Sequence, residues 1–300
     1  MREGTNPNRS KRVKPYAPVV IGAITHLPNL KGYHSERFDV IRASLETMRA
    51  NAGMSCQVWI WDNGSCVNLR SWLLNEYRPD FLTFSYNVGK SIARASMVKG
   101  LPPDRVVGIA DDDMFYYPDW LKKQMEVLTT YPNVGTVSGW PVRTQFRFHN
   151  SATVDWGKRN AEMRTGRFIS PEEDKDFCDS IGRDYEKHIA PFNRKTGLGS
   201  AGELDTKLTY KGVKTYATGH HAQWIGIAGV VAPYLTFTPE AMADERPFER
   251  ALNDAEMLRL TTFKRTSQHI GNIIDKRLED LWHGYVTRVA DSSLAYQPAI

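Results

Sequence analysis

The sequence predicts an α/β fold in which a mostly parallel sheet is covered by helices on both faces. Between residues 17 and 132, apolar runs of strand length alternate with segments that repeat apolar residues at helical spacing. Such alternation favours a parallel sheet, since consecutive parallel strands are joined by a crossover that is usually a helix. No G-x-G-x-x-G follows the first predicted strand and no Walker-type loop occurs, so neither a dinucleotide fold nor a P-loop is favoured.

The first half of the chain contains four predicted strands, each followed by a predicted helix. The turn at Asn63-Gly64 ends the second strand, and Pro118 begins the fourth helix, which Tyr131-Pro132 ends. A fifth strand is predicted over 134–142. In chain order, the paired strands and helices are predicted at 17–26 and 35–52, 55–65 and 68–77, 81–87 and 89–101, and 105–113 and 118–132.

The second half is more polar and its pattern is looser. Residues 143–215 are rich in Arg, Lys, Asp and Gly, and their hydrophobic content is too low for a separate core. We therefore predict a disordered basic arm over 1–15 and a single domain over 16–300, with halves at 16–142 and 143–300. The later elements are predicted as helices at 171–189, 247–263 and 269–289, a hairpin at 206–218 and a buried apolar segment at 221–237.

Composition places few limits on function. The net charge of +5 and the pI near 9.0 favour an anionic ligand without naming one. Three cysteines, Cys56, Cys66 and Cys178, form neither a disulfide framework nor a zinc spacing, which is typical of a reducing compartment. No secretory signal is recognised, and the apolar run Ile225–Phe237 is shorter than the roughly 20 residues of a membrane span. A cytoplasmic protein without a membrane span is expected.

Polar side chains stand where the predicted strands end. His26, Asp62, Asn87 and Asp111 each follow an apolar run. The carboxyl ends of parallel strands meet at one edge of the sheet, where ligands of such sheets bind. The sequence therefore predicts a ligand site built from these four strand ends.

The triplet Asp111-Asp112-Asp113 is the strongest chemical signal at that edge. If the strand stays extended, Asp111 and Asp113 point to one side and Asp112 to the other, which makes Asp112 the most replaceable of the three. Two carboxylates on one side form a hard-oxygen site of the kind that Mg²⁺ or Mn²⁺ prefers. The alternative is a solvated acidic turn that caps the helix at Pro118.

Three motifs occur in the order and at the spacing of a known family: "WIWDNGS" at 59–65, "NVGKSIARA" at 87–95 and "ADDDMFYYPDWL" at 110–121. Over roughly residues 17–140 the chain resembles the family 2 nucleotide-sugar glycosyltransferases, whose glycosyltransferase A-type (GT-A) fold has a mostly parallel, Rossmann-like sheet. The resemblance implies that Asp111 and Asp113 bind a divalent metal ion. It also implies a nucleotide-sugar site formed by Thr25, Asp62, Asn87, Gly89, Lys90, Arg94, Asp111 and Asp112, with Asp62 at the base and Lys90 within reach of a phosphate.

The later half resembles the family more weakly. "WIGIAGVVAPYL" looks like the segment that lines the sugar and acceptor sites, which adds Gly226 and Gly229 to the donor-site residues. An acidic pair follows about fifteen residues later, the distance found in the family. The resemblance implies that Asp244 is the general base, with Glu245 as the second candidate and Asp254 as an alternative. His269 in "SQHIGN" matches the family's C-terminal metal ligand. Residues 16–142 would then bind the nucleotide sugar, and 143–300 would form the elaborated acceptor side with its C-terminal helices.

The chemistry that follows is metal-dependent glycosyl transfer. Mn²⁺ or Mg²⁺ stabilises the departing diphosphate, and one carboxylate base with direct displacement implies inversion. The expected donor is a nucleoside-diphosphate sugar, with a UDP-sugar first. The acceptor stays open among a glycan, a protein and a modified nucleic-acid base, because residues 143–215 carry no readable motif.

The same residues also permit two other functions and several purely structural roles. The same acids would suit a nucleotidyltransferase on a related fold, and the basic charge would suit a non-enzymatic protein that binds nucleic acid or glycans. Asp62 alone is also a turn former, Asp244 and Glu245 are also helix caps, and His269 is also a surface histidine. For His220 and His221, a structural role is preferred over ligand contact.

Overall fold

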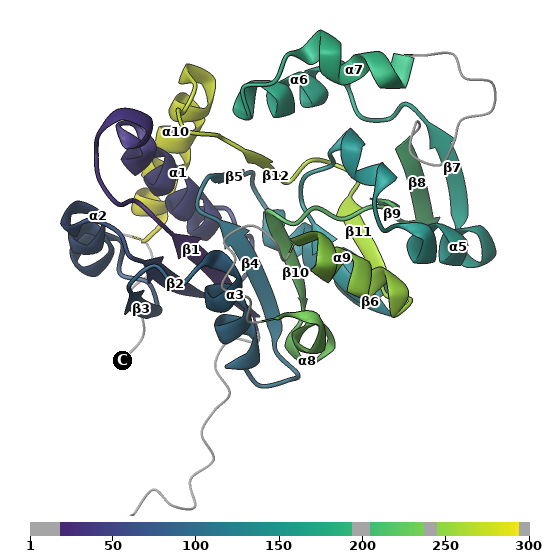
Figure 1. The fold of residues 1–300 in the computed structure, drawn as a ribbon, viewed down its shortest axis with the longest axis horizontal. Coiled ribbons are helices and arrows are strands. Elements are labelled where there is room, and N and C mark those ends of the chain that lie inside the picture. Colours follow the sequence, from purple (N-terminus) through teal and green to yellow (C-terminus); the bar gives the residue numbers. More distant parts are fainter. Residues whose placement is uncertain (1–18, 194–204, 237–244, 294–300) are drawn as a thin grey trace, which may run out of the picture.

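The computed structural model describes residues 19–193, 205–236 and 245–293, so the predicted arm over 1–15 lies outside the described part. Its main feature is one ten-stranded sheet with the order β3-β2-β1-β4-β10-β6-β11-β9-β8-β7. The sheet runs across the whole molecule, and strands from both halves of the chain lie within it (Figure 1).

The first four long strands form a parallel block. They are β1 (Val19–Thr25), β2 (Gln57–Asn63), β3 (Phe81–Ser85) and β4 (Val106–Asp111). The crossovers between them carry α1 (Arg37–Ala50), α2 (Val67–Trp72) with a π turn at Leu73–Tyr77, and α3 (Lys90–Lys99). Since Thr25 pairs with Asp62 and Ile24 with Asp111, the carboxyl ends of β1, β2 and β4 meet at one edge, as the strand-end residues predicted.

The remaining strands extend the sheet from β4. They are β6 (Val134–Ser138), β7 (Glu162–Gly166), β8 (Asp205–Tyr210), β9 (Val213–Tyr216), β10 (Gln223–Ile227) and β11 (Leu258–Thr262). Within the described part of the chain, β10, β9 and β7 run against the other seven strands of this sheet. Seven strands in one direction confirm the predicted mostly parallel sheet.

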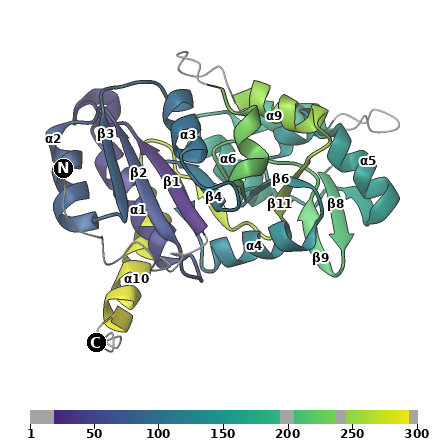
Figure 2. The same cartoon turned by 90° about the horizontal axis from the view of Figure 1, so that it is seen from below.

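Helices cover both faces of the sheet (Figure 2). Apolar side chains of α1 and of α4 (Trp120–Thr130) pack in the larger core cluster on one face, and α3 packs on the other face with α8 (Ala228–Val231) and α9 (Glu245–Asp254). The other helices are α5 (Ser151–Asn160), α6 (Pro171–Ser180), α7 (Tyr185–Asn193) and α10 (Lys276–Ser293), with short 3-10 turns at Gly32–His34, Arg143–Arg147 and Ala232–Tyr234. The α/β fold class is confirmed.

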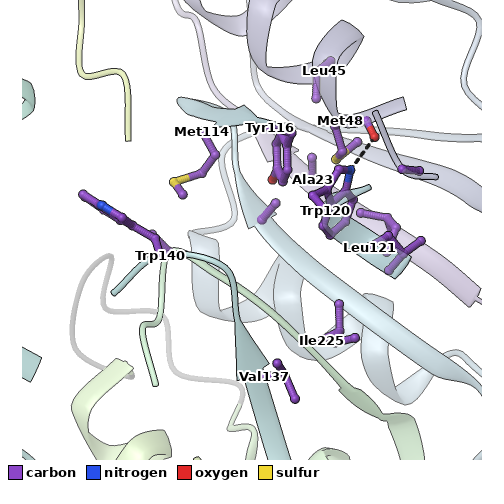
Figure 3. Close-up of a cluster of buried hydrophobic side chains, with 14 of the residues drawn as sticks. Ala23, Leu45, Met48, Met114, Tyr116, Trp120, Leu121, Val137, Trp140 and Ile225 are labelled. Carbon is purple, nitrogen blue, oxygen red and sulfur yellow. Dashed lines mark hydrogen bonds between the residues drawn. The ribbon is translucent and has the colours of Figure 1, made fainter. Parts of the chain in front are cut away.

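Trp120 fills the core beneath the edge of the sheet that carries the acidic triplet. Its ring packs against Tyr116 with a centroid distance of 4.7 Å, and its Nε1–H donates to the carbonyl of Met48 over 2.8 Å (Figure 3). Tyr116 belongs to β5 (Met114–Tyr116), which pairs with β12 (Ser267–His269) in a second, two-stranded sheet. This packing fixes the chain that follows the triplet and brings His269 to the same edge.

Three predicted helices differ from the structure. The helix predicted over 247–263 ends at Asp254, and Leu258–Thr262 forms β11, a fully buried strand paired with β6; burial within the sheet overrides the helical spacing. The helix predicted over 171–189 is two helices, because the chain turns at Gly182 with a φ of +62°. The helix predicted from residue 269 begins at Lys276, since Ser267–His269 pairs with β5. None of the described helices is both long and apolar enough to span a membrane.

Candidate active site

A cavity of about 330 Å³ lies at the carboxyl ends of β1, β2 and β4. Its position follows from the fold, because the parallel strands all end there and their backbone groups and side chains face open space. The cavity is lined by His26, Tyr33, His34, Arg37, Asn63, Asn87, Gly89, Lys90 and the acidic triplet, together with Ile24. The structure thus brings predicted donor-site residues of two separate segments, 87–90 and 111–112, to one cavity.

Lys90 links the first acid of the triplet to α9. Its Nζ lies 2.7 Å from Asp111 Oδ1 and 2.8 Å from Glu245 Oε1. Burial lowers the pKa of Lys90, but Asp111 and Glu245 outweigh burial, so the pKa is raised overall. Burial also raises the pKa of Asp111 despite this neighbouring ammonium group. One lysine therefore joins the predicted metal ligand to a predicted base.

The triplet does not alternate as an extended strand, which corrects the prediction for Asp112. β4 ends at Asp111, so Asp112 and Asp113 lie in a turn, and Arg37 contacts both carboxylates, at 2.5 Å and 3.1 Å respectively. Asp112 also accepts the backbone N–H of His26 and is only 7% exposed. Burial raises its pKa to about 6 in spite of Arg37. Asp112 is thus tightly bonded within the protein, and the alternating geometry from which its replaceability was predicted is absent.

Asp113 faces two basic groups and keeps one oxygen free of hydrogen bonds. Its Oδ2 lies 3.3 Å from His269 Nε2 and 3.1 Å from Arg37 Nη1. Burial raises the pKa of Asp113, but His269 and Arg37 hold it well below its usual range. Burial lowers the pKa of His269, whereas Asp113 raises it, and the net direction is upward. Oδ1 of Asp113 is buried and accepts no hydrogen bond from the described residues.

His269 is held by stacking as well as by its acid. Its ring lies parallel to that of Trp140, with an interplanar angle of 6° and a centroid distance of 5.9 Å. The structure thereby places His269 beside Asp113, one of the two acids that the resemblance implies as metal ligands, and a ligand role for His269 stays a prediction. Among the described residues, however, no group of three or more His, Cys, Asp or Glu side chains is arranged to hold a metal ion by itself.

Asp62 lies behind the cavity and is fully buried. Its carboxylate accepts hydrogen bonds from Arg70 Nε at 2.8 Å, from the backbone N–H of Ser65 at 3.3 Å and from the hydroxyl of Thr25 at 3.4 Å. Arg70 was not identified from the sequence, although it stands eight residues after Asp62 in the helix that follows the turn. In this structure, Asp62 and Thr25 organise the strand end, and their side chains are not open to the cavity.

The neighbouring amides build the wall of the cavity instead. Asn63 Nδ2 donates to Asn87 Oδ1 over 3.0 Å, and Asn63 Oδ1 accepts the backbone N–H of Val88 over 2.8 Å. Asn87 Oδ1 also accepts the N–H of Gly89, which adopts φ +88° and ψ 147° directly before α3. Such a backbone is open almost only to glycine. These contacts aim the first turn of α3, and with it Lys90, at the acidic triplet.

Glu245 stands at the first position of α9, at the far side of this cluster. Its Oε1 faces Lys90 and, at 3.4 Å, Nη2 of the buried Arg94, while its Oε2 lies 3.1 Å from His221 Nε2. Burial raises the pKa of Glu245, but Lys90, His221 and Arg94 lower it to about 2. Asp244, the other predicted base, lies outside the described residues.

Three further predicted residues lie away from the cavity. Asp254 ends α9 and lines a separate cavity with Asp155 and Trp156. Gly226 pairs with Val107 near the start of β4, where a Cβ would lie 2.5 Å from the carbonyl oxygen of Gly135. Gly229 is in α8, and its Cβ would meet the backbone of Pro103 at 2.8 Å. The two glycines permit close packing, and neither is brought to the strand ends.

The chain was compared with protein families, curated proteins and solved structures. The model of the family described as "Glycosyl transferase family 2" matches residues 33–195, which is more than half of the chain. Among solved structures, the chain is similar to the mannosyltransferase PcManGT from Pyrobaculum calidifontis in complex with GDP-Man and Mn²⁺. The two are 21% identical with a TM-score of 0.34, and the match covers 45% of this chain and 40% of the other. No curated protein matches. The family match includes α1, the strand ends of β2 and β4, and the acidic triplet, and the chain therefore belongs to glycosyl transferase family 2.

Proposed function

We propose that this glycosyltransferase moves a sugar from a nucleoside-diphosphate sugar, with a UDP-sugar as first choice, to a hydroxyl acceptor with inversion. The observation that carries the proposal is that Asp111 and Glu245 contact the same ammonium group, that of Lys90. A carboxylate suited to hold a metal ion and a carboxylate suited to act as a base thus lie on either side of one cation. A sugar bound by its diphosphate at Lys90 would have both groups next to its reacting carbon.

A divalent ion, Mn²⁺ or Mg²⁺, fits the residues at the triplet. Such ions are often held by one or two carboxylates, and substrate phosphates and water supply the other ligands. Asp113 Oδ1 is a buried acceptor without a donor among the described residues, which is a free ligand position. Asp111 and Asp113 would hold the ion with His269 beside them, and the bound ion would supply charge stabilisation to the departing diphosphate.

The chain's own groups would perform the remaining steps. Lys90 lines the cavity, and the buried Arg94 lies beside it through their shared contact with Glu245; together their charges would offset phosphate charge. Glu245, or Asp244 beside it in the sequence, would accept the proton of the attacking hydroxyl, a contribution of roughly 10²–10⁴ in rate. A carboxylate with a pKa of about 2 is a weak base, so Glu245 needs Lys90 to leave it for the diphosphate before it acts.

The test measures product release by the full chain with a panel of UDP-glucose, UDP-galactose, UDP-N-acetylglucosamine and GDP-mannose. We expect release of a nucleoside diphosphate in the presence of Mn²⁺, loss of that release with excess chelator, and loss in Asp113→Asn while circular dichroism shows that this variant is still folded. Asp39→Asn on the exposed face of α1 is the matched control. Where an acceptor is found, NMR of the product should show the inverted anomer.

Other results would identify a different function. Full activity with chelator, or in Asp113→Asn, contradicts the metal-dependent mechanism. Release of pyrophosphate indicates nucleotidyl transfer in place of glycosyl transfer. DNA binding that weakens with salt, without turnover of any sugar nucleotide, indicates a binding protein.

A further inference from the structure

His221 lies between two carboxylates beside the candidate site. Its Nε2 is 3.1 Å from Glu245 Oε2, and its Nδ1 is 3.7 Å from Glu249 Oε1. Both acids belong to α9, one turn apart, and His221 comes from the loop between β9 and β10. The imidazole therefore connects a loop anchored in the sheet to the start of α9.

The loop that carries His221 is fixed on both sides. The backbone carbonyl of Ala222 accepts the N–H of Asp111 over 2.8 Å. His220 exchanges two backbone hydrogen bonds with the hydroxyl of Ser138, at 2.8 Å and 2.9 Å, and its ring stacks on that of His221 with centroids 4.6 Å apart. His221 is thus tied to the end of β4, which carries the first acid of the triplet, and to the end of β6.

The second acid is also held in place. Glu249 is 3% exposed, and its Oε1 lies 2.6 Å from Nη2 of the buried Arg259. Arg259 in turn donates to the backbone carbonyls of Phe148 and His149, at 3.2 Å and 2.9 Å. With Glu249 anchored in this way, the ring of His221 has a fixed acidic neighbour, 3.7 Å from Nδ1, on the side away from Glu245.

The two oxygens of Glu245 have different partners. Oε1 faces Lys90, which lines the cavity and would meet the diphosphate of a donor, and the buried Arg94, whereas Oε2 faces His221. A diphosphate carries more charge than one carboxylate and competes for Lys90. When Lys90 turns to the diphosphate, Oε1 loses a partner and becomes open to a substrate proton, and the contact with His221 is unaffected.

We propose that His221 is a positioning residue for Glu245, which it orients through Oε2 while Oε1 receives the acceptor proton. This rests on the proposed role of Glu245 as the base. A hydrogen bond to Oε2 limits rotation of the carboxylate, and a base must stay within about 3 Å of the proton that it removes. His221 is then needed in the step that transfers the sugar, and it is not needed to bind the nucleotide.

The test uses two amides that place a donor at different positions of the imidazole. The amide nitrogen of Gln reaches the place of Nε2, whereas that of Asn reaches only the place of Nδ1. We therefore expect His221→Asn to lower kcat for nucleoside-diphosphate release at least tenfold, and His221→Gln to keep half of kcat or more. Affinity for UDP or GDP with Mn²⁺, measured by calorimetry, should stay within twofold in both variants. His283→Gln on the exposed side of α10 is the control.

The outcomes separate this inference from the proposed function. If the wild-type chain releases no nucleoside diphosphate from any sugar nucleotide of the panel, the proposed function is wrong and the role of His221 falls with it. If the wild type is active and His221→Asn keeps its kcat, only the role of His221 is overturned. Equal losses of kcat in the Asn and Gln variants, or a loss of nucleotide affinity and melting temperature together with kcat, would show a structural role and also overturn it.

Discussion

Arg37 Nη2 lies 2.5 Å from Asp112 Oδ1, and both side chains are at most about one-tenth exposed. The same guanidinium contacts Asp113 and donates to the side-chain oxygen of Asn272 over 3.0 Å. Asp112 raises the pKa of Arg37 further than burial lowers it. A cation from α1 thus offsets two of the three adjacent carboxylates and ties them to the segment between β12 and α10.

Replacing Arg37 with Met should lower the free energy of unfolding by about 3 kcal/mol, because it leaves the buried Asp112 carboxylate without its cation and removes one of the two basic groups beside Asp113. Urea denaturation at neutral pH measures the difference. Arg42→Met, on the same helix, removes only a partly exposed arginine with ion pairs of 3.7 Å, so its cost should stay below about 1 kcal/mol. If Arg37→Met and Arg42→Met lower the free energy of unfolding equally, the buried Arg37–Asp112 ion pair contributes no more to stability than an exposed one.

Two glycine-to-alanine changes should have opposite effects on stability. Gly89→Ala places a Cβ where the backbone has φ +88° and ψ 147°, which costs about 1–3 kcal/mol and moves Lys90 away from Asp111. Gly284→Ala lies in α10, where a Cβ meets no atom within 4 Å, and should gain about 1 kcal/mol from helix propensity. Thermal and urea unfolding compare the two. A stabilised Gly89→Ala would contradict the backbone argument.

The stability of the protein should depend on His220 below neutral pH. Burial lowers the pKa of His220 well below 6.5, and the neighbouring His221, His269, Lys90 and Arg259 lower it further. As the pH falls through 6.5, His220 therefore binds a proton in the unfolded chain but stays neutral in the folded chain. The contribution of His220 to the free energy of unfolding is thus fully present above pH 6.5 and decreases as the pH falls. One such proton is worth up to about 1.4 kcal/mol per pH unit.

The measurement compares urea unfolding at pH 5, 6 and 7 without added metal. In the wild type, the N–H of Ala222 donates to His220 Nδ1 over 3.0 Å. The Asn side chain in His220→Asn keeps an acceptor for this N–H but does not titrate. We expect the free energy of unfolding to depend less on pH in this variant than in the wild type. The exposed control His283→Asn should have the same pH dependence as the wild type. An identical dependence in wild type and His220→Asn would exclude His220 as the group responsible.

Much of the fold could be predicted because its signals are local. The alternation of strands and helices up to residue 132 is a property of short windows, and the structure confirms β1 to β4 and the helices between them. The spacing of Leu258 and Leu260 predicts a helix, but these residues lie in a buried strand beside β6. A short apolar segment has no fixed structure of its own, and the neighbouring strand decides between the two.

The sequence by itself determined the fold class and the family, and it predicted the edge of the sheet at which the strand-end residues and the acidic triplet meet. Those conclusions depend on strand ends and on motifs within windows of about ten residues, as with the glycine before Lys90. Only the tertiary structure decided which groups offset the acidic triplet. Arg37 lies 76 positions from Asp113, and Lys90 lies 155 positions from Glu245. Such pairs depend on the order of strands in the sheet and on the turn after β4. Charged side chains find partners across the whole chain, and local sequence does not encode that choice.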